Sequence, residues 1–337
     1  MIKNNRKVRG LLLYSGGLDS ILAAKLLLDQ NVELKALSFV LPFFSPWKDP
    51  WDTKAGKMAK SIGLDVSFIR LDMDYMRMVE APKNGWGKNI NPCIDCKIYF
   101  LKYAASYMHE NAYDFVATGE VLGQRPMSQQ RNRLNQIEFE TNLQGKLLRP
   151  LSAKHMTPTD VENEGLIDRE KLLKIHGRSR DMQMALAKQY GIKDYATPAG
   201  GCLFTDENFA PKVKDLFTYC KNFYTTEDIY QCSLGRHFRI NEKCKVIVSR
   251  NGDETEILYS KCFANCKIMT AFAGPVALLR GEYSEDDIIT AATILLRYGK
   301  GNMAGNNLVS VIEGNCHHEK LIEKVADDDF INRLRIK

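Results

Sequence analysis

The chain has 337 residues, a formal net charge of +6, and 45% hydrophobic and 26% charged residues, an ordinary composition for a globular protein that is long enough for two domains. No apolar run approaches the roughly 20 residues that cross a bilayer, and the short apolar stretch near the N-terminus runs into Ser-Gly-Gly, unlike a signal peptide. We therefore expect a cytoplasmic protein with no membrane contact, whose positive charge permits contact with nucleic acid.

The first part of the chain alternates between strand and helix patterns. Residues 8–14 are nearly all apolar, which is typical of a strand buried on both faces. We predict further strands at 32–41, 64–71, 115–118 and 147–151, and helices at 19–30, 51–62, 94–110 and 129–142, with one or two more within 168–190. This alternation predicts right-handed βαβ units and a doubly wound, mostly parallel sheet of the α/β class.

The pattern changes after residue 212. Residues 236–258 alternate like antiparallel strands with a turn at Asn251-Gly252, and residues 284–298 have the pattern of a helix. We place a domain boundary near 212–222. It separates an N-terminal domain, 1–212, from a smaller α+β domain, 222–337.

A loop with the composition of a phosphate site follows the first predicted strand: Ser15-Gly16-Gly17-Leu18-Asp19-Ser20. Two glycines let backbone N–H groups approach phosphate oxygens, and the next helix offers its positive dipole end. Asp19 is a natural ligand for Mg²⁺ on the phosphates. A Walker lysine is absent from this loop, which argues against γ-phosphoryl transfer. A capped strand-to-helix turn is the alternative interpretation.

This loop resembles the pyrophosphate loop (PP-loop) of the N-type ATP pyrophosphatases. The resemblance implies an adenine nucleotide alpha hydrolase-like fold and cleavage of ATP between its α- and β-phosphates. It also implies that the six loop residues bind the nucleotide phosphates, and that adenine lies against the second strand near Ser38 and Phe39.

Nine cysteines, an odd number, argue against a disulfide framework. Cys93 and Cys96 form a C-x-x-C at the start of a predicted helix, where thiolates are stabilised, and Cys202 follows a glycine-rich loop at 197–201. Three interpretations stay open. The cysteines are unrelated, or they bind zinc with His155 or His176 as a candidate fourth ligand, or they carry sulfur chemistry through persulfides or an iron–sulfur cluster.

Four motifs resemble, in the same order, those of tRNA thiolation enzymes, the tRNA-specific 2-thiouridylases and 4-thiouridine synthetases. They are Cys-Ile-Asp-Cys-Lys-Ile-Tyr-Phe at 93–100, Ala-Thr-Gly-Glu at 117–120, Leu-Arg-Pro-Leu-Ser at 148–152 and Ala-Gly-Gly-Cys-Leu-Phe at 199–204. In two-cysteine relatives, a persulfide would form on Cys93 or Cys96 and Cys202 would attack it. In three-cysteine relatives, the cysteines hold a [4Fe-4S] cluster with one open iron. This chain has the three-cysteine pattern, so the resemblance favours the cluster.

Other polar residues are candidates for the same pocket. Gly119 ends a predicted strand, where α/β sheets bind ligands, and Arg125 could meet phosphate or adenylate charge. A solvated polar loop is the alternative for the segment around Arg125. Thiouridylases often carry Thr-Gly-His where this chain has Glu120 after Gly119, so the role of Glu120 stays open. Arg149, Ser152 and Lys154 are further candidates for the same cleft. The basic segment 177–180 could face RNA or phosphate, and its alternative interpretation is a solvated helix face.

Basic residues of the C-terminal domain could hold RNA phosphates, and this region faintly resembles the RNA-binding module of the NFACT family. The basic residues are Arg236, His237, Arg239, Lys243, Lys245, Arg297, Lys300 and Lys320. Cys262, Cys266 and Cys316-His317-His318 fit no standard zinc-finger spacing, so we interpret them as ordinary cysteines and histidines.

Together these features predict an ATP-dependent tRNA sulfurtransferase that adenylates a uridine carbonyl oxygen and replaces it with sulfur. The expected catalytic residues are Asp19, Cys93, Cys96 and Cys202, with ATP, Mg²⁺ and a [4Fe-4S] cluster as cofactors. Expected partners are tRNA and a sulfur donor, either sulfide or a persulfide carrier such as a cysteine desulfurase, and a homodimer is a candidate assembly. The alternatives are a PP-loop enzyme that adenylates a small molecule (a deazaguanine-nitrile synthase or a cofactor sulfur insertase) and a non-enzymatic RNA-binding or nucleotide-sensing protein.

Overall fold

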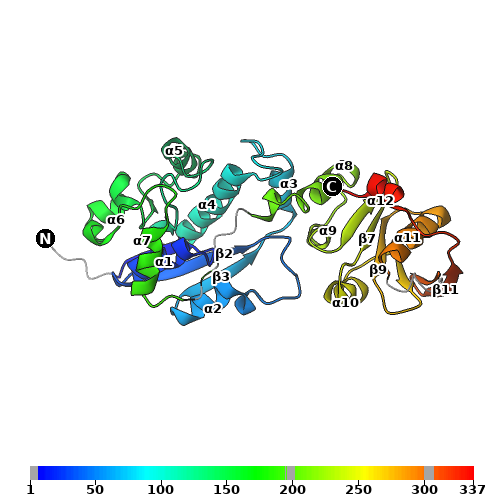
Figure 1. Ribbon diagram of the computed structural model, residues 1–337. Coiled ribbons are helices and arrows are strands. Elements are labelled where there is room, and N and C mark those ends of the chain that lie inside the picture. The colour runs from blue at the N-terminus through cyan, green and yellow to red at the C-terminus, as the bar shows by residue number, and fades with distance from the viewer. Residues whose placement is uncertain (1–6, 194, 196–201, 300–306) are drawn as a thin grey trace. The chain divides into compact units, whose positions relative to one another are not determined.

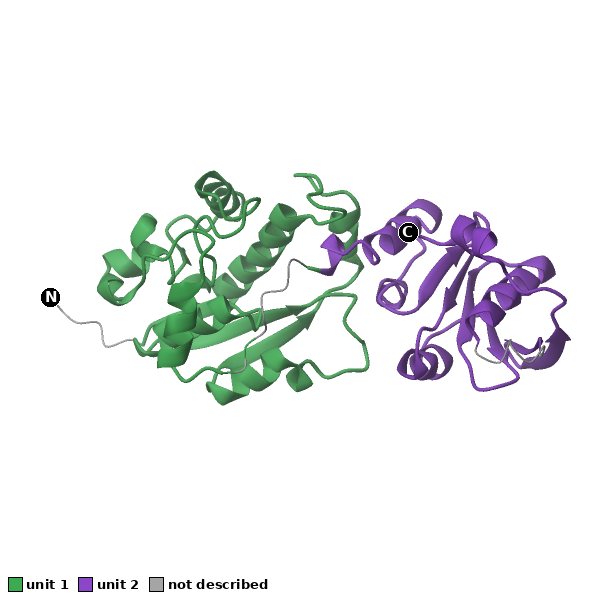
Figure 2. Ribbon diagram, in the orientation of Figure 1, with its two compact units in different colours: residues 1–202 green, residues 203–337 purple. Residues whose placement is uncertain are grey.

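A computed structural model describes residues 7–193, 195, 202–299 and 307–337. The chain divides into two compact units, residues 1–202 and residues 203–337 (Figure 2). The predicted loop at 197–201 and Lys300 lie outside the described residues. Within the described ranges, no helix combines the length and apolar character that crossing a bilayer requires.

The first unit is built on a five-stranded sheet in the order β3-β2-β1-β4-β5, with every neighbouring pair parallel (Figure 1). β1 is central, and its last residue, Leu13, pairs with Leu37 on one side and Thr118 on the other. The chain therefore changes direction across the sheet between β1 and β4, where ligands bind in such folds. The strands are β1 (Arg9–Leu13), β2 (Glu33–Val40), β3 (Asp65–Arg70), β4 (Phe115–Thr118) and β5 (Leu147–Leu148).

Helices cover both faces of this sheet. One face packs against α1 (Leu18–Leu28), α2 (Lys54–Ser61) and α7 (Asp181–Gln189). The other packs against α4 (Cys93–Glu110) and α5 (Arg131–Glu140), with α3 (Met73–Glu80) beside α4. The remaining helix of the unit is the short α6 (Asp160–Asn163).

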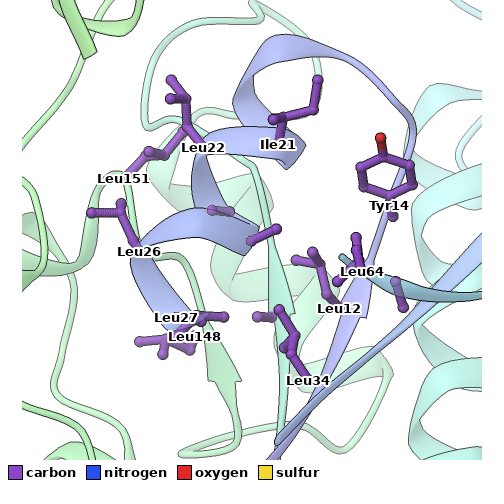
Figure 3. Close-up of a cluster of buried hydrophobic side chains, with 14 of the residues drawn as sticks. Leu12, Tyr14, Ile21, Leu22, Leu26, Leu27, Leu34, Leu64, Leu148 and Leu151 are labelled. Atoms are coloured by element: carbon purple, nitrogen blue, oxygen red, sulfur yellow. The ribbon is translucent and has the colours of Figure 1, made fainter. Parts of the chain in front are cut away.

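Alternation along the strands explains why they are apolar throughout. Leu12 and Leu34 lie in the apolar cluster of α1, which Figure 3 shows with Leu22, Leu26 and Leu27. Leu11, the neighbour of Leu12, lies in the cluster of α4 instead. Because successive strand residues point to opposite faces, a strand covered on both faces needs apolar residues at both. The predicted class, a doubly wound parallel sheet, is thus confirmed.

One helix of the first unit, α3, is not among the predicted elements, although Asp72 gives a helix-start signal: its side chain accepts a hydrogen bond from the Asp74 N–H (3.0 Å). The one or two helices predicted within 168–190 correspond to a 3₁₀ turn at Arg169–Lys171 followed by α7.

The second unit has a six-stranded sheet in the order β11-β10-β8-β9-β7-β6, in which every neighbouring pair is antiparallel. α11 and α12 pack on one face, and residues of α9 and α10 pack on the other. This agrees with the predicted smaller α+β domain. The strands are β6 (Arg236–Arg239), β7 (Cys244–Val248), β8 (Cys266–Thr270), β9 (Val276–Gly281), β10 (Leu308–Glu313) and β11 (Cys316–Leu321). The helices are α8 (Ala210–Tyr219), α9 (Thr226–Gln231), α10 (Gly252–Ser260), α11 (Glu285–Tyr298) and α12 (Asp328–Leu334).

The predicted strand turn at Asn251-Gly252 is wrong, because this dipeptide begins a helix. β7 ends at Val248, and Asn251 caps α10 by accepting a hydrogen bond from the Glu254 N–H (2.9 Å). Asn-Gly is a common hairpin signal, but asparagine is also a strong helix cap, and the local sequence does not distinguish the two uses.

The boundary between the units lies earlier than the predicted 212–222, because α8 belongs to the second unit. The buried Lys212 donates hydrogen bonds to the carbonyl oxygens of Cys232 (3.2 Å) and Gly235 (2.9 Å). Asp215 accepts hydrogen bonds from Arg239 (3.0 and 2.5 Å), and its Oδ2 lies 3.2 Å from Lys245 Nζ. These contacts join residues at least 20 positions apart, so the composition of the segment gives no sign of them.

We predict that a fragment of residues 203–337 unfolds cooperatively and at a higher temperature than one of residues 222–337. The shorter fragment lacks Asp215 and leaves Arg239 and Lys245 without their buried carboxylate, which costs about 3–5 kcal/mol when one partner of a buried pair is removed. Thermal unfolding followed by circular dichroism measures the difference. Asp215→Asn within 203–337 should reproduce most of it, and equal stability of the two fragments would contradict the assignment of α8.

Candidate active site

The loop Ser15–Ser20 turns the chain from β1 into α1 at the switch point of the sheet. Gly16 has a φ of +71°, and a Cβ at this position would lie 2.2 Å from the Cβ of Ala55, so only glycine fits. Gly17 is the N-cap of α1 and has no side chain with which to bind the amides of the first turn. The Ser20 N–H donates to the Gly17 carbonyl oxygen (3.0 Å). In the described part of the chain the Leu18 and Asp19 N–H groups make no such backbone bond, so they are available to another acceptor, as in anion sites.

The end of β4 touches this loop. A Cβ at Gly119 would lie 2.6 Å from both the carbonyl carbon of Asp19 and the backbone nitrogen of Ser20. Gly119 therefore permits backbone contact between β4 and the start of α1. The residue that follows it, Glu120, belongs to a separate ion-pair network described below.

Asp19 lies in a cluster of polar side chains from three segments. Gln124 Nε2 donates to Asp19 Oδ2 (2.9 Å), and Gln183 Nε2 donates to Gln124 Oε1 (3.2 Å). Arg180 Nη2 lies 3.7 Å from Asp19 Oδ1. Within the described residues, Asp19 Oδ1, Arg180 Nε and Gln183 Oε1 are buried without a hydrogen-bond partner. Buried polar atoms are nearly always satisfied, so this cluster fits a bound cation and anion such as Mg²⁺ and phosphate.

The other predicted nucleotide residues do not all lie on this face. Ser38 is buried and alternates with Leu34 and Ala36, which pack in the α1 cluster. Phe39 points to the opposite face, where its ring stacks on Phe100 of α4 (centroids 4.5 Å apart). Arg125 is exposed, and its neighbour Gln124 is the side chain that reaches Asp19.

The cysteine pair begins α4. Cys93 Sγ donates to Ser128 Oγ (3.2 Å), and Cys96 Sγ lies 3.0 Å from the Tyr75 hydroxyl. The exposed Cys202 lies near the same place, because its Sγ is 3.6 Å from Asn91 Oδ1, two residues before Cys93.

The three sulfurs form one electrostatic group. Burial raises the pKa of Cys96, and negative charge on Cys202 or Cys93 raises that pKa further. The structure therefore places Cys202 near the start of the helix that carries Cys93 and Cys96, although the three sulfurs are not arranged as a set of metal ligands among the described residues. It differs from the expected thiolate stabilisation at a helix N-terminus, since the loss of solvent around Cys96 outweighs any such effect.

These cysteines fit a cluster better than a four-ligand zinc site. The rings of His155 and His176 pack on each other (centroids 4.9 Å apart), and His155 Nε2 lies 2.8 Å from the carbonyl oxygen of Lys174. Across the described ranges, no three His, Cys, Asp or Glu side chains are arranged as metal ligands, so ligation requires the cysteines to leave their present partners. Three thiols without a fourth protein ligand match the donor set that the resemblance to three-cysteine tRNA thiolation enzymes implies for a [4Fe-4S] cluster.

A buried ion-pair network joins the end of β4 to the cysteine helix. Glu120 pairs with Lys97 of α4 through Oε1 and with Arg149 through Oε2 (3.1 Å from Nε). Arg149 also pairs with Glu138 of α5 (2.9 Å). Lys97 Nζ lies 3.4 Å from the carbonyl oxygen of Ser128, the residue whose hydroxyl bonds Cys93. The sequence indicates no role for Lys97, because no local signal reveals a partner 23 residues away.

The remaining sequence candidates have structural partners. Arg149 is fully buried in the ion-pair network. Ser152 accepts from the Leu122 N–H (3.0 Å) and donates to the Ile175 carbonyl oxygen (2.7 Å), so it ties two loops together. Lys154 pairs with Glu170 (2.8 Å).

In the second unit, the basic residues expected to form an RNA face are largely engaged with other groups. His237 and Lys245 are buried, and Arg239 pairs with Asp215. The other ion pairs are Lys243 with Glu282, Arg297 with Asp328 and Lys320 with Glu285. Cys262 and Cys266 are buried in two different apolar clusters, which agrees with their interpretation as ordinary cysteines.

Residues 6–157 match the family model described as thiamine biosynthesis protein (ThiI), and residues 235–333 match the model described as NFACT protein RNA binding domain. Both resemblances found in the sequence are thus confirmed: the first unit carries a ThiI domain of the PP-loop family, and the second carries an NFACT-type RNA-binding domain. A search among curated proteins found no match.

Three solved structures are similar to this chain. One is a predicted subunit of tRNA methyltransferase from Methanocaldococcus jannaschii, 15% identical with a TM-score of 0.35, covering 54% of this chain and 76% of that one. Another is the U34-tRNA thiolase NcsA from Methanococcus maripaludis with its [4Fe-4S] cluster, 20% identical with a TM-score of 0.34, covering 68% and 71%. The third is a 4-thiouridine synthetase–RNA complex with bound ATP, 17% identical with a TM-score of 0.39, covering 60% and 46%.

We predict that Glu120→Gln destabilises the first unit by about 3–5 kcal/mol at neutral pH, because it leaves two cations without their buried carboxylate. Burial alone would raise the pKa of Glu120, but Lys97 and Arg149 outweigh burial and lower it from 4.5 to about 2. A depressed carboxyl pKa stabilises the fold above 4.5, and this contribution is lost as the pH falls from 4.5 toward 2.

The measurement is urea unfolding of wild type and variant at several pH values between 7 and 3. The stability gap should narrow below pH 4.5. Glu140→Gln is the matched control, because Glu140 pairs with the exposed Lys83 and this variant should cost little. A gap that stays constant down to pH 3 would argue against a carboxylate held ionised by its two neighbours.

Proposed function

We propose that this protein is an ATP-dependent tRNA sulfurtransferase, which adenylates a uridine carbonyl oxygen and replaces that oxygen with sulfur. The observation that carries the proposal is that Gly119 and Glu120 connect the end of β4 to the PP-loop and to the helix that begins with Cys93 and Cys96, while the Cys202 Sγ lies 3.6 Å from Asn91 Oδ1, just before that helix. The RNA-binding domain of the second unit supports RNA as the substrate.

The PP-loop side of the site serves activation. The uridine oxygen attacks the α-phosphorus of ATP, the bond from that phosphorus to the bridging oxygen breaks, and pyrophosphate leaves. The first-turn amides of α1 and the hydroxyls of Ser15 and Ser20 bind the phosphates. Asp19 would hold Mg²⁺ through Oδ1, which has no hydrogen-bond partner among the described residues, and Mg²⁺ supplies charge neutralisation for the departing pyrophosphate.

The cysteine side serves sulfur transfer. Cys93, Cys96 and Cys202 would hold a [4Fe-4S] cluster, which when bound supplies a position for exogenous sulfide. Sulfur at the sulfide level attacks the base carbon, the carbon–oxygen bond breaks, and AMP departs, so no net redox change occurs. Lys97, fixed by Glu120 beside the Cys93–Ser128 pair, would place a positive charge next to the cysteine side of the site.

We predict that anaerobically purified protein contains about four iron atoms and four sulfides per chain with a broad visible absorption band. Cys202→Ala should lose the iron, because it removes one of three ligands. Iron and acid-labile sulfide analysis measures this. Cys316→Ala, which removes an exposed cysteine of the second unit, is the control and should keep the cluster. One zinc and no iron in the wild type would overturn the cluster, and iron-free protein that carries a persulfide would replace it with the two-cysteine route.

We predict that tRNA from a strain lacking the gene loses one thiouridine, and that the wild-type gene restores it. Asp19→Asn and Cys202→Ala should each fail to restore it, since the first impairs activation and the second impairs sulfur delivery. Mass spectrometry of tRNA nucleosides measures the outcome, with Cys316→Ala as a variant that restores the nucleoside. Unchanged thiouridines in the deletion strain would overturn the proposal.

A second candidate is sulfur insertion into a small molecule, favoured by the description of the matched family as a thiamine biosynthesis protein. The two differ in what triggers pyrophosphate release from ATP. Release that requires tRNA supports the main proposal, whereas release with small-molecule acceptors and growth of the deletion strain only with added thiamine would support the second.

A further inference from the structure

Arg180 is placed at the PP-loop by a series of specific contacts. The Gly177 N–H donates to the carbonyl oxygen of Leu122 (2.8 Å), and Leu122 pairs with His176 in a parallel bridge. The Ser152 hydroxyl accepts a hydrogen bond from the Leu122 N–H and donates one to the Ile175 carbonyl oxygen, so it links these two segments. These bonds hold the segment before α7 against the loop that follows β4.

α7 is in turn fixed to α1. The Tyr190 hydroxyl donates to Asp29 (2.7 Å), Lys25 lies over the Tyr190 ring, and Ala187 is buried in the α1 cluster. Arg180 is the N-cap residue of α7. Its backbone position is therefore fixed by the contacts of the segment before α7 and by the contacts of α7 with α1. Arg180 reaches Asp19 from a segment 161 residues away in the chain.

The Arg180–Asp19 pair is incomplete. The closest distance, 3.7 Å, is within ion-pair range but longer than a hydrogen bond. Asp19 Oδ1 and Arg180 Nε are both buried without a hydrogen-bond partner among the described residues. A bidentate arginine–carboxylate pair would satisfy both atoms, so this geometry leaves each group able to take a better partner.

Gln183 adds an independent indication of a missing ligand. Its side chain is fully buried, its Nε2 donates to Gln124 (3.2 Å), and its Oε1 has no partner in the described part of the chain. Gln124 in turn donates to the other oxygen of Asp19. The unsatisfied atoms thus comprise two acceptors and one cationic donor, which suit a hydrated cation beside a phosphate.

We propose that Arg180 exchanges partners when nucleotide binds: it pairs with Asp19 in the empty site, and it pairs with the β- or γ-phosphate of ATP once Mg²⁺ takes Asp19. This inference rests on the proposed function and adds to it a residue that recognises the triphosphate. The exchange keeps both charges compensated before and after binding. It also makes Mg²⁺ and the triphosphate bind together, because each removes the partner of one member of the pair.

The exchange predicts an effect of Mg²⁺ that a simple phosphate contact does not. Without Mg²⁺, Asp19 keeps Arg180 and repels the triphosphate. With Mg²⁺, Arg180 is released toward the phosphates. AMP has no β- or γ-phosphate, so its affinity should be independent of Arg180.

The experiment is equilibrium binding of ATP and AMP to the full-length protein by calorimetry, with Mg²⁺ or with EDTA, in the absence of tRNA. Arg180→Gln should weaken Mg·ATP binding by about tenfold to a hundredfold, the usual range for a charge-assisted hydrogen bond. It should leave AMP binding unchanged and lose most of its effect in EDTA. Arg180→Lys should recover part of the affinity, because lysine keeps the positive charge but cannot form the two parallel hydrogen bonds of a guanidinium group.

Arg178→Gln is the matched control, since Arg178 is exposed in the same segment and the charge change is identical. A double-mutant cycle tests the pairing: in EDTA, Asp19→Asn should strengthen ATP binding, and Arg180→Gln on that background should abolish the gain.

Equal Mg·ATP affinities for Arg178→Gln and Arg180→Gln would overturn the exchange while leaving the proposed function intact. Failure of the wild type to bind ATP at all would overturn the proposed function as well. Circular dichroism checks that each variant is folded. If Arg180→Gln does not fold, the Mg·ATP affinity of Arg180→Lys is compared with that of the wild type instead.

Discussion

The arrangement of the first unit depends on one buried carboxylate, Glu120. A charge without solvent is costly unless it is paired, so Glu120 can remain ionised only with Lys97 and Arg149 in place. Lys97 lies directly after the second cysteine of the C-x-x-C, and Arg149 follows β5 and reaches α5 through Glu138. The position of the cysteine pair relative to the sheet is therefore set by an electrostatic requirement at the end of β4.

The residue before Glu120 sets the other half of the site. Gly119 lies in backbone contact with Asp19 and Ser20, so one dipeptide fixes the PP-loop on one side and the cysteine helix on the other. The proposed replacement of oxygen by sulfur would require an activated carbon and a sulfur atom to meet at a defined distance, and positioning both groups from one rigid segment would favour such a reaction. Glu120, whose role the sequence leaves open, is part of a buried ion-pair network.

In the second unit, several of the basic side chains take part in ion pairs within the unit. Most of the basic side chains that resembled an RNA-binding face are paired with carboxylates, and the two that are most buried, His237 and Lys245, lie inside the fold. Asp215 in α8 compensates Arg239 and Lys245 and so determines where the unit begins. The number of basic residues in a segment therefore does not locate the surface that contacts RNA.

The sequence by itself determined the parallel sheet, the helix that follows each of its first two strands and the PP-loop, because each depends on patterns within about ten neighbouring residues. It linked Cys202 to Cys93 and Cys96 only through the order of motifs that resemble those of tRNA thiolation enzymes. It misplaced the unit boundary and the use of Asn251-Gly252, and it did not separate Ser38 from Phe39, which point to opposite faces. Only the tertiary structure decided the partners of Glu120, Asp19 and Arg180. Those partners are 23 to 161 residues apart, and a charged residue in a sequence looks the same whether solvent or a buried counter-charge surrounds it.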